Sequence, residues 1–408
     1  MKKAKARHLS GWLIFISGSE EFSFTSKANN SLNFSIFALK IPSTMTTFLS
    51  LLRLGIGDRS ILPPKGVEWP QVLRMAEEHS LSGVLLDAVD HLPEGERPPK
   101  EMLLEWIGQT MMSYESRYEE YRKAIADLAA WYRAHGYKMM VLKGHTCSLD
   151  WPRPEHRPCG DIDIWLFGQQ QEADDALSRE AGIEIDRTHH HHTVFTWQDF
   201  MVENHYDFLN VHHHRSNVAF ERILKELGRD DSHWTEVAGE RVYLPSPNLH
   251  ALFLLKHLMG HFAADRITLR QLLDWGFFVK AHGQEVDWNF VQGVLERFGM
   301  MGMFHILNAI CVEELGLPGL PGPAARSIGA ASVPPAAAVN PSLKNRVWNE
   351  ILSPEFQGTM PARLLPRIVY KFRRWKANGW KHELCYKDTL WSAFWAGVWG
   401  HLLKPKSI

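Results

Sequence analysis

The stretch CGDIDIWLFG at residues 159–168 sets two carboxylates, Asp161 and Asp163, inside a strongly apolar run. Side chains alternate between the two faces of a β-strand, so residues two apart point the same way. Both acids therefore share one face, and Ile162 and Ile164 occupy the other. Two like charges held side by side repel each other unless a cation lies between them. The run predicts a core strand whose polar face holds a metal ion or a basic group.

The segments around this strand predict an α+β unit over residues 113–218. Residues 115–136 carry apolar side chains at helical spacing and end at a glycine, which commonly follows a helix C-terminus. The next run, YKMMVLKG, predicts a short strand, and residues 169–182 predict a helix that again ends in glycine. Residues 193–214 alternate in polarity around a polar turn, which predicts a β-hairpin.

The rest of the chain divides by pattern into helical regions and two irregular segments. Amphipathic spacing predicts short helices before the α+β unit, and the run SPNLHALFLLKHLMGHF after it predicts a buried helix. The predicted divisions are a poorly ordered extension (1–44), an N-terminal helical region (45–112), the α/β core (113–218), a helical domain (219–315), a Pro/Ala/Gly linker (316–341) and a basic aromatic helical tail (342–408).

Composition excludes several classes of protein. The chain of 408 residues is 45% hydrophobic with a net charge of −1, so its overall charge does not predict a polyanionic partner. The four cysteines are scattered without a CxxC pair, which fits a reducing compartment and gives no disulfide or zinc framework. No apolar run reaches the roughly 18 residues that a membrane span needs. We therefore expect a cytoplasmic protein without a membrane span.

Three features point to phosphoryl chemistry: the paired acids, a lysine–glycine turn before them and a third acid after them. Lys143-Gly144 ends the strand before them, and a glycine there lets backbone N–H groups approach a phosphate. Glu203, in MVENHY, is a third acid in an apolar stretch. Carboxylates on adjacent strands can hold Mg²⁺ together with substrate phosphates, and one acid can serve as a base toward an attacking hydroxyl. The pattern predicts in-line displacement at phosphorus.

The run VLKGHTCSLDWPRPEHRPCGDIDIWL (141–166) resembles the nucleotidyltransferase signature of the DNA polymerase beta superfamily, a glycine turn followed by alternating apolar and acidic residues. Its longer form closely resembles the uncharacterised nucleotidyltransferases, and the similarity extends to VENHYDFLN, LLKHLMGHF, ITLRQLLDWG and the Trp-rich tail. This resemblance implies a polymerase beta-like α/β core with a mixed sheet, flanked by helical N- and C-terminal regions. It also implies that Asp161, Asp163 and Glu203 are the catalytic acids and ligands for Mg²⁺ (or Mn²⁺). The implied reaction transfers a nucleoside monophosphate from an NTP to an acceptor hydroxyl and releases pyrophosphate.

The phosphate turn departs from the superfamily pattern, because Gly144 is followed by His145 where Gly-Ser or Gly-Gly is usual. A serine contact to the phosphates therefore has no counterpart here. We expect backbone N–H groups of Gly144 and His145 to face the phosphates, with Lys143 and Arg157 as neutralising cations. Lys256 on the buried helix is predicted to reach toward the acids, as helical domains of this superfamily commonly do, or else to be a core lysine.

Two histidine runs, HHHH at 189–192 and HHH at 212–214, raise the question of zinc. Consecutive residues of a strand alternate faces, so one run cannot place all its imidazoles on one ion. Exposed polar turns are the preferred interpretation. His205 shares the face of Glu203, which leaves open a role close to the metal or the substrate.

The tail run RLLPRIVYKFRRWK interleaves six basic residues with aromatic ones. It could bind RNA or a membrane surface, but aromatic residues packed in a core beneath a solvated basic face are the favoured interpretation. Farther upstream, Arg270 and Asp274 stand four residues apart and predict a structural ion pair.

The acceptor of the predicted transfer stays open between a small molecule, a sugar, a protein side chain and an RNA end. Nucleic acid is possible but not favoured. The alternative function is a non-catalytic nucleotide-binding or scaffolding protein of the same fold. His145 at the phosphate turn favours that alternative, and the three intact acids oppose it.

Overall fold

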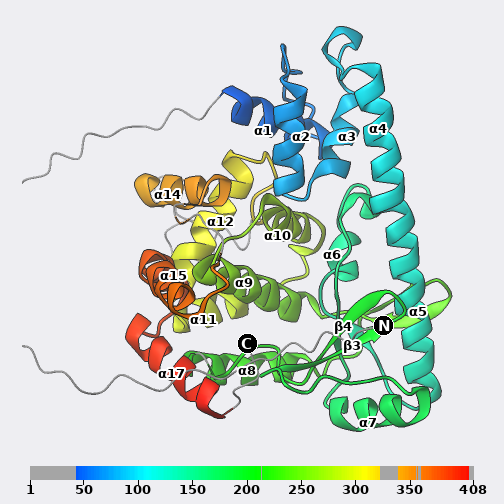
Figure 1. Cartoon of the computed structure of the whole chain (residues 1–408), viewed down its shortest axis with the longest axis vertical. Coiled ribbons are helices and arrows are strands. Elements are labelled where there is room, and N and C mark those ends of the chain that lie inside the picture. Colours follow the sequence, from blue (N-terminus) through cyan, green and yellow to red (C-terminus); the bar gives the residue numbers. More distant parts are fainter. Residues whose placement is uncertain (1–42, 213, 322–338, 355, 357–359, 404–408) are drawn as a thin grey trace, which may run out of the picture. The chain divides into compact units, whose positions relative to one another are not determined.

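The computed structural model describes residues 43–212, 214–321, 339–354, 356 and 360–403 (Figure 1). The predicted extension lies outside the described residues except for its last two, which begin the first helix. Most of the predicted Pro/Ala/Gly linker lies outside them as well. No helix in the described part of the chain is long and apolar enough to cross a membrane.

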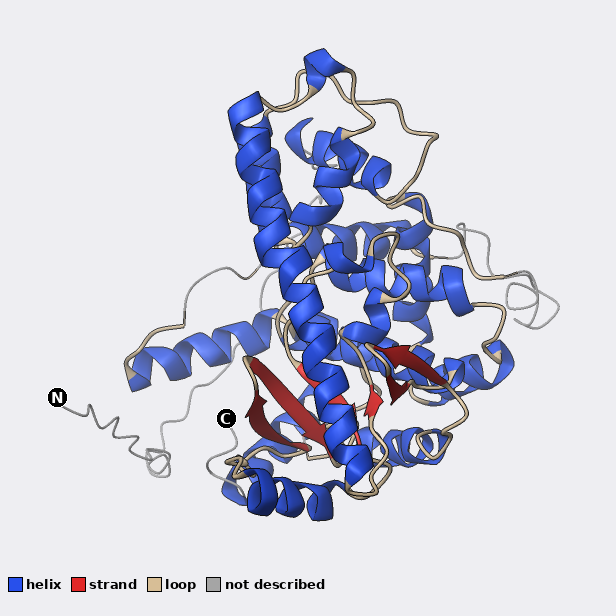
Figure 2. Cartoon of the chain, turned by 90° about the vertical axis from the view of Figure 1, so that its right-hand side faces the viewer, coloured by secondary structure: helices blue, strands red, loops and turns tan. Residues whose placement is uncertain are grey.

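Helices form the N-terminal region, as the apolar spacing predicted. They are α1 (Ser43–Gly55), α2 (Trp69–Glu78), α3 (Ser82–Val89), the 3₁₀ turn η1 (Glu94–Glu96) and α4 (Lys100–Thr110). A π-helical segment, η2 (Met111–Ser116), then leads without a break into α5 (Arg117–Ala134). Figure 2 shows these last three elements as one long helical column that runs across the sheet.

Six strands form one mixed sheet in the order β3-β4-β2-β1-β6-β5. Parallel pairs join β2 to β4 and β1 to β6, and the other neighbours are antiparallel. The strands are β1 (Met140–Val141), β2 (Ile162–Trp165), β3 (His192–Trp197), β4 (Phe200–His205), β5 (Trp234–Val237) and β6 (Glu240–Tyr243). The short helix α6 (His145–Ser148) and the 3₁₀ turn η3 (Pro154–His156) connect β1 to β2.

The structure confirms the predicted hairpin and both predicted core helices, and it adds one element. β3 and β4 turn at Gln198, and α7 (Gln170–Ala181) ends at Gly182 in the left-handed region with φ 67°. The β5–β6 hairpin falls in a region predicted to be wholly helical. Its strands are only four residues long and half-exposed, so they leave a weak sequence pattern.

One hydrophobic core lies between the sheet and α5. Ile162 and Ile164 of β2 pack there with Tyr121, Leu128 and other residues of α5. All of these side chains are fully buried. Because neighbouring residues of a strand face opposite ways, this packing turns the acid at position 163 toward the other face of the sheet.

A second, larger core joins the N-terminal helices to the helical region after the sheet. Its central helix is α9 (Pro247–Ala264), which is buried nearly all round, as predicted. The other helices described in the C-terminal half are α8 (Arg215–Leu227), α10 (Leu269–His282), α11 (Trp288–Arg297), α12 (Met301–Glu313), α14 (Pro341–Leu352), α15 (Leu364–Ala377), α16 (Gly379–Cys385) and α17 (Leu390–Leu403). The architecture is thus α+β, with a six-stranded mixed sheet and helices before and after it in sequence.

Candidate active site

Asp163 and Glu203 lie side by side on neighbouring strands. β2 and β4 run parallel, and their register pairs Asp163 with Glu203. Side chains at paired positions of adjacent strands project from the same face of the sheet. One carboxylate oxygen from each acid and one ring nitrogen of His205 all lie within 4.8 Å of one another. The sheet therefore brings together two acids that are forty positions apart in the sequence.

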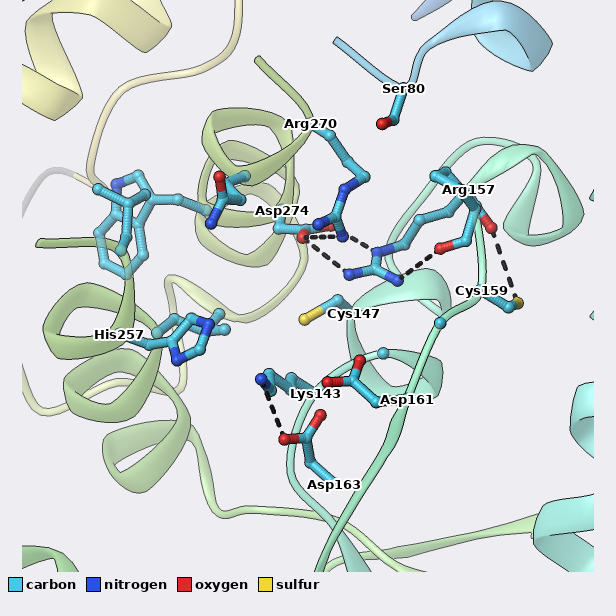
Figure 3. Close-up of a pocket in the computed structure, with 17 residues that line it drawn as sticks. Ser80, Lys143, Cys147, Arg157, Cys159, Asp161, Asp163, His257, Arg270 and Asp274 are labelled. Atoms are coloured by element: carbon cyan, nitrogen blue, oxygen red, sulfur yellow. Dashed lines mark hydrogen bonds and ion pairs between the residues drawn. The ribbon is translucent and has the colours of Figure 1, made fainter. Parts of the chain in front are cut away.

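Two cationic groups contact the Asp163 carboxylate, which is wholly buried. Lys143 Nζ lies 3.0 Å from Asp163 Oδ1, and His205 Nε2 lies 3.2 Å from the same oxygen (Figure 3 shows the lysine pair). Burial alone would raise the pKa of Asp163, but the charge of Lys143 and the hydrogen bond from His205 hold it well below its usual range. Burial likewise opposes the charged form of His205, yet the two carboxylates raise its pKa to about 9. Asp163 is therefore an anion clamped by two cations.

Asp161 precedes β2 and is held through its backbone. Its carbonyl oxygen accepts a 2.8 Å hydrogen bond from the Tyr121 hydroxyl on α5, which leaves its carboxylate beside that of Asp163 (Figure 3). Burial and the nearby charge of Asp163 raise the pKa of Asp161. Among the three acids, Asp161 thus carries the least compensated charge, which is the condition that a bound cation would relieve.

Gly144 makes the turn between β1 and α6 and has a φ of 66°, in the left-handed region. A Cβ atom there would lie 2.4 Å from the Tyr121 hydroxyl oxygen, so only glycine fits. His145, the next residue, is 2% exposed, and neither of its ring nitrogens has a partner among the described residues. Burial lowers its pKa to about 4, so the imidazole is neutral. The His145 ring is not among the groups that line the adjoining cavity.

A cavity of about 210 Å³ opens beside the acids (Figure 3). The sheet side contributes Asp161, Asp163, Lys143 and Gly144. Glu203 is not among the lining residues, although it adjoins Asp163. The remaining lining residues come from the loop before β2, from Ser80 and from the helices α6, α9 and α10: Cys147, Arg157, Pro158, Cys159, Gly160, Leu254, His257, Leu258, Arg270, Gln271, Asp274 and Trp275.

Two arginines share one carboxylate in the wall of this cavity. Arg157 binds Asp274 with two hydrogen bonds, Nε to Oδ1 at 2.7 Å and Nη2 to Oδ2 at 2.9 Å. Arg270 Nη1 is 3.7 Å from the same Oδ2, so the predicted Arg270–Asp274 ion pair exists but is the weaker of the two. Burial and the charge of Arg157 lower the pKa of Arg270. Two arginines and one carboxylate leave this wall with one excess positive charge. Arg270 is the arginine with the weaker contact to the carboxylate.

A protein-family model described as uncharacterised nucleotidyltransferase matches residues 65–316, more than half of the chain. The chain belongs to this family. No curated protein and no solved structure gives a significant match. The matched segment contains the three acids, the glycine turn, and the parts of α9 and α10 that line the cavity.

Lys256 does not reach the acids, which corrects its expected role toward the nucleotide and agrees with the alternative of a core lysine. Its Nζ lies 4.1 Å from the centre of the Tyr386 ring and 5.5 Å from that of Phe220, and it is absent from the cavity lining. Burial lowers its pKa to about 8. A helix turns by about 100° per residue, so the next residue, His257, faces the cavity instead.

The histidine run at 189–192 is not an exposed polar turn. His190 and His192 are 5% and 7% exposed. Residues 189–191 form a bend before β3, so strand alternation does not separate their side chains. As a result, one ring nitrogen each of His191, His192 and His205 lies within 4.8 Å of the others, next to Glu203.

Sequence reasoning missed the part of Arg270 and His257 in the cavity wall. The sequence shows only that Arg270 stands four residues before Asp274, which predicts an ion pair between them. It does not show that Arg157 competes for the same carboxylate. Arg157, which we expected to neutralise phosphate charge, binds Asp274 through one edge of its guanidinium, so that edge is not free for a phosphate.

Proposed function

We propose that this protein is a metal-dependent nucleotidyltransferase that transfers a nucleoside monophosphate from an NTP to an acceptor hydroxyl and releases pyrophosphate. The observation that carries the proposal is that Asp161 and Asp163 line a cavity whose wall also holds Arg157 and Arg270, while Glu203 is paired with Asp163 on the neighbouring strand. The glycine turn, the alternating acids and the mixed sheet also support a polymerase beta-like fold for the core.

The acids fit a divalent cation. Asp163 Oδ2 is buried and has no hydrogen-bond partner within the described chain, and the pKa of Asp161 is raised by burial and by its acidic neighbour. Carboxylate oxygens are the ligands that Mg²⁺ and Mn²⁺ prefer. We assign Asp161, Asp163 and Glu203 as the ligands. When bound, the ion neutralises phosphate charge and makes the acceptor hydroxyl more acidic.

Lys143 and Arg270 are the cations that we assign to the triphosphate. Lys143 is tied to Asp163 but lines the cavity, and the one carboxylate that Arg270 meets within the described residues lies 3.7 Å away. The backbone of Gly144 lines the same cavity without a side chain in the way. Arg157, held by Asp274, fixes the shape of the wall and adds positive charge to it.

In the proposed step the acceptor oxygen forms a bond to the α-phosphorus while the bond from that phosphorus to the bridging oxygen breaks. Pyrophosphate leaves, and the acceptor proton moves to a carboxylate oxygen of Asp161. Asp161 is the best placed base because it lines the cavity and has a raised pKa, whereas Asp163 already accepts from Lys143 and His205 and Glu203 lies outside the lining.

Labelled nucleotides test the proposal. The full chain is incubated with cell extract and an NTP labelled at either the α- or the γ-phosphate, with Mg²⁺, with Mn²⁺ or with a chelator. We expect transfer of the α-label only, dependent on the metal and absent for Asp163→Asn. Asp175→Asn, an exposed acid on α7, is the matched control. Transfer of the γ-label would mean phosphoryl transfer and contradict the proposal. The labelled product identifies the acceptor as a small molecule, a sugar, a protein or an RNA end.

A non-catalytic nucleotide-binding protein is the second candidate, and one contact favours it. The ammonium of Lys143 lies 3.0 Å from Asp163, where a metal ion would otherwise neutralise the carboxylate. In that case NTP would bind equally well with and without a divalent ion, and no label would be transferred under any condition.

A further inference from the structure

Three of the four exposed tryptophans in the described chain lie on one face of α17. Trp391, Trp395 and Trp399 follow each other at intervals of four residues and are 60%, 58% and 65% exposed. Residues four apart in a helix lie one above the other on the same side. Exposure of so much aromatic surface to water is unfavourable, and a contiguous exposed apolar patch is typical of an interaction site.

A second apolar stripe lies on α15 and meets the first. Leu365, Val369 and Phe372 are 75%, 56% and 53% exposed at spacings of four and three. The Trp375 ring joins the helices, because its centroid lies 5.6 Å from that of Phe372 and 5.2 Å from that of Trp391. We call the exposed apolar residues of α15 and α17 the tail surface. The run RLLPRIVYKFRRWK was expected to pack its aromatic residues in a core; Phe372 is exposed instead, whereas Tyr370 and Trp375 are half-buried.

Basic side chains flank the α15 part of the tail surface. Residues 361–382 contain no Asp or Glu, and α15 alone carries five basic residues. Lys371, Arg373 and Lys376 are exposed, and no acid in the described part of the chain pairs with them. Lys376 stands one turn after Phe372 and Arg373 directly follows it, so their long side chains can extend beside the apolar stripe. The α17 sequence contains no Asp, Glu, Lys or Arg.

We propose that the tail surface binds the surface of a lipid bilayer that contains anionic lipids. Tryptophan side chains favour the boundary between headgroups and acyl chains, and basic side chains are attracted to anionic headgroups. α17 has 14 residues, too few to span a bilayer, so both helices lie along the surface. A symmetric pairing of this face with a second copy would set the basic residues of α15 against each other, which disfavours dimerisation here.

Vesicle binding of the full chain tests this proposal. Neutral phosphatidylcholine vesicles are compared with vesicles that also contain phosphatidylglycerol, by co-sedimentation and by the blue shift of tryptophan fluorescence. We expect binding to the anionic vesicles that weakens with added salt. Trp395→Ser with Trp399→Ser should reduce the partition coefficient more than tenfold, and so should Arg373→Glu with Lys376→Glu.

Matched substitutions elsewhere keep the test specific. Trp234→Ser removes an exposed tryptophan from β5, and Arg222→Glu with Lys280→Glu reverses two exposed charges outside the tail. These controls should bind as the unmodified chain does. Absence of binding, equal binding to neutral vesicles, or equal losses in tail and control variants would overturn the proposal. So would a dimer in light scattering that the tail tryptophan variant converts to a monomer.

Discussion

Replacing Asp163 and Asp161 in turn by asparagine should have opposite effects on stability, although both changes should abolish transfer. In Asp163→Asn, half-buried Lys143 and buried His205 lose the anion that they share. In Asp161→Asn, a carboxylate disfavoured by burial and by its acidic neighbour is replaced by a neutral group of the same shape. The two acids are therefore matched in chemistry and position but differ in their electrostatic surroundings.

The magnitude follows from the contacts. Removing one partner of a buried ion pair costs about 3–5 kcal/mol, because the other charge is left uncompensated. Lys143 keeps the attraction of Asp161, which places Asp163→Asn near the lower end, at a loss of about 3 kcal/mol in the free energy of unfolding. For Asp161→Asn we expect a change between zero and a gain of about 1 kcal/mol, the size of a relieved like-charge contact.

Urea unfolding of the chelator-treated protein, followed by circular dichroism, measures both values. Chelation is needed because a bound divalent ion would stabilise the unmodified chain by mass action and obscure the comparison. A pair of variants with equal losses, or a greater loss for Asp161→Asn, would refute the assignment of Asp163 as the clamped anion. Full transfer activity in either variant would refute the metal-ligand role.

Three other substitutions test the remaining features. Lys256→Met should raise the free energy of unfolding at pH 7 by about 1–2 kcal/mol, because the cost of burying the charge, seen in the fall of the pKa to about 8, exceeds the gain from the cation–π contact. In urea titrations, the stability of the unmodified chain should rise between pH 8 and 10.5, because the unfolded chain binds more protons there. The variant should lack this rise. Arg270→Ala should weaken NTP binding at least tenfold in calorimetric titration. Unchanged affinity, or an equal loss for Lys280→Ala, an exposed control residue, would contradict the assignment of Arg270 to the phosphates. Gly144→Ala should lower the melting temperature and NTP affinity because of the positive φ and the Tyr121 hydroxyl, and Tyr121→Phe should restore only the part due to the clash.

Local patterns predicted much of the fold. The spacing of Tyr118, Tyr121 and their neighbours gave the buried face of α5, and alternation gave the orientation of β2. These predictions succeed because a helix or strand has a fixed period, so a run of side chains reveals which face is buried. The β5–β6 hairpin was not predicted, because its short, half-exposed strands show no clear alternation of apolar and polar residues.

Side-chain contacts between distant segments could not be predicted from the sequence, for a different reason. The sequence identified Arg157, Arg270 and Asp274 as candidates for ion pairs. It did not show that Arg157 would donate to both carboxylate oxygens of Asp274. It could place Lys256 on a buried helix, but not say which side of that helix meets the sheet. Packing between elements decides such contacts, and the sequence period within one element carries no information about them.

Local sequence patterns were enough to predict the chemical groups of the site: two acids on one strand face, a third acid on another strand, and a glycine turn ahead of them. Those properties are local, since alternation and backbone sterics act within a few residues. The remaining features depend on how distant segments pack. Glu203 is in register with Asp163, Lys143 and His205 contact that acid, and Arg270 rather than Lys256 faces the cavity. The physical reason is that charge acts through space, so the surroundings of an ionised group depend on which distant segments the fold brings within a few ångströms.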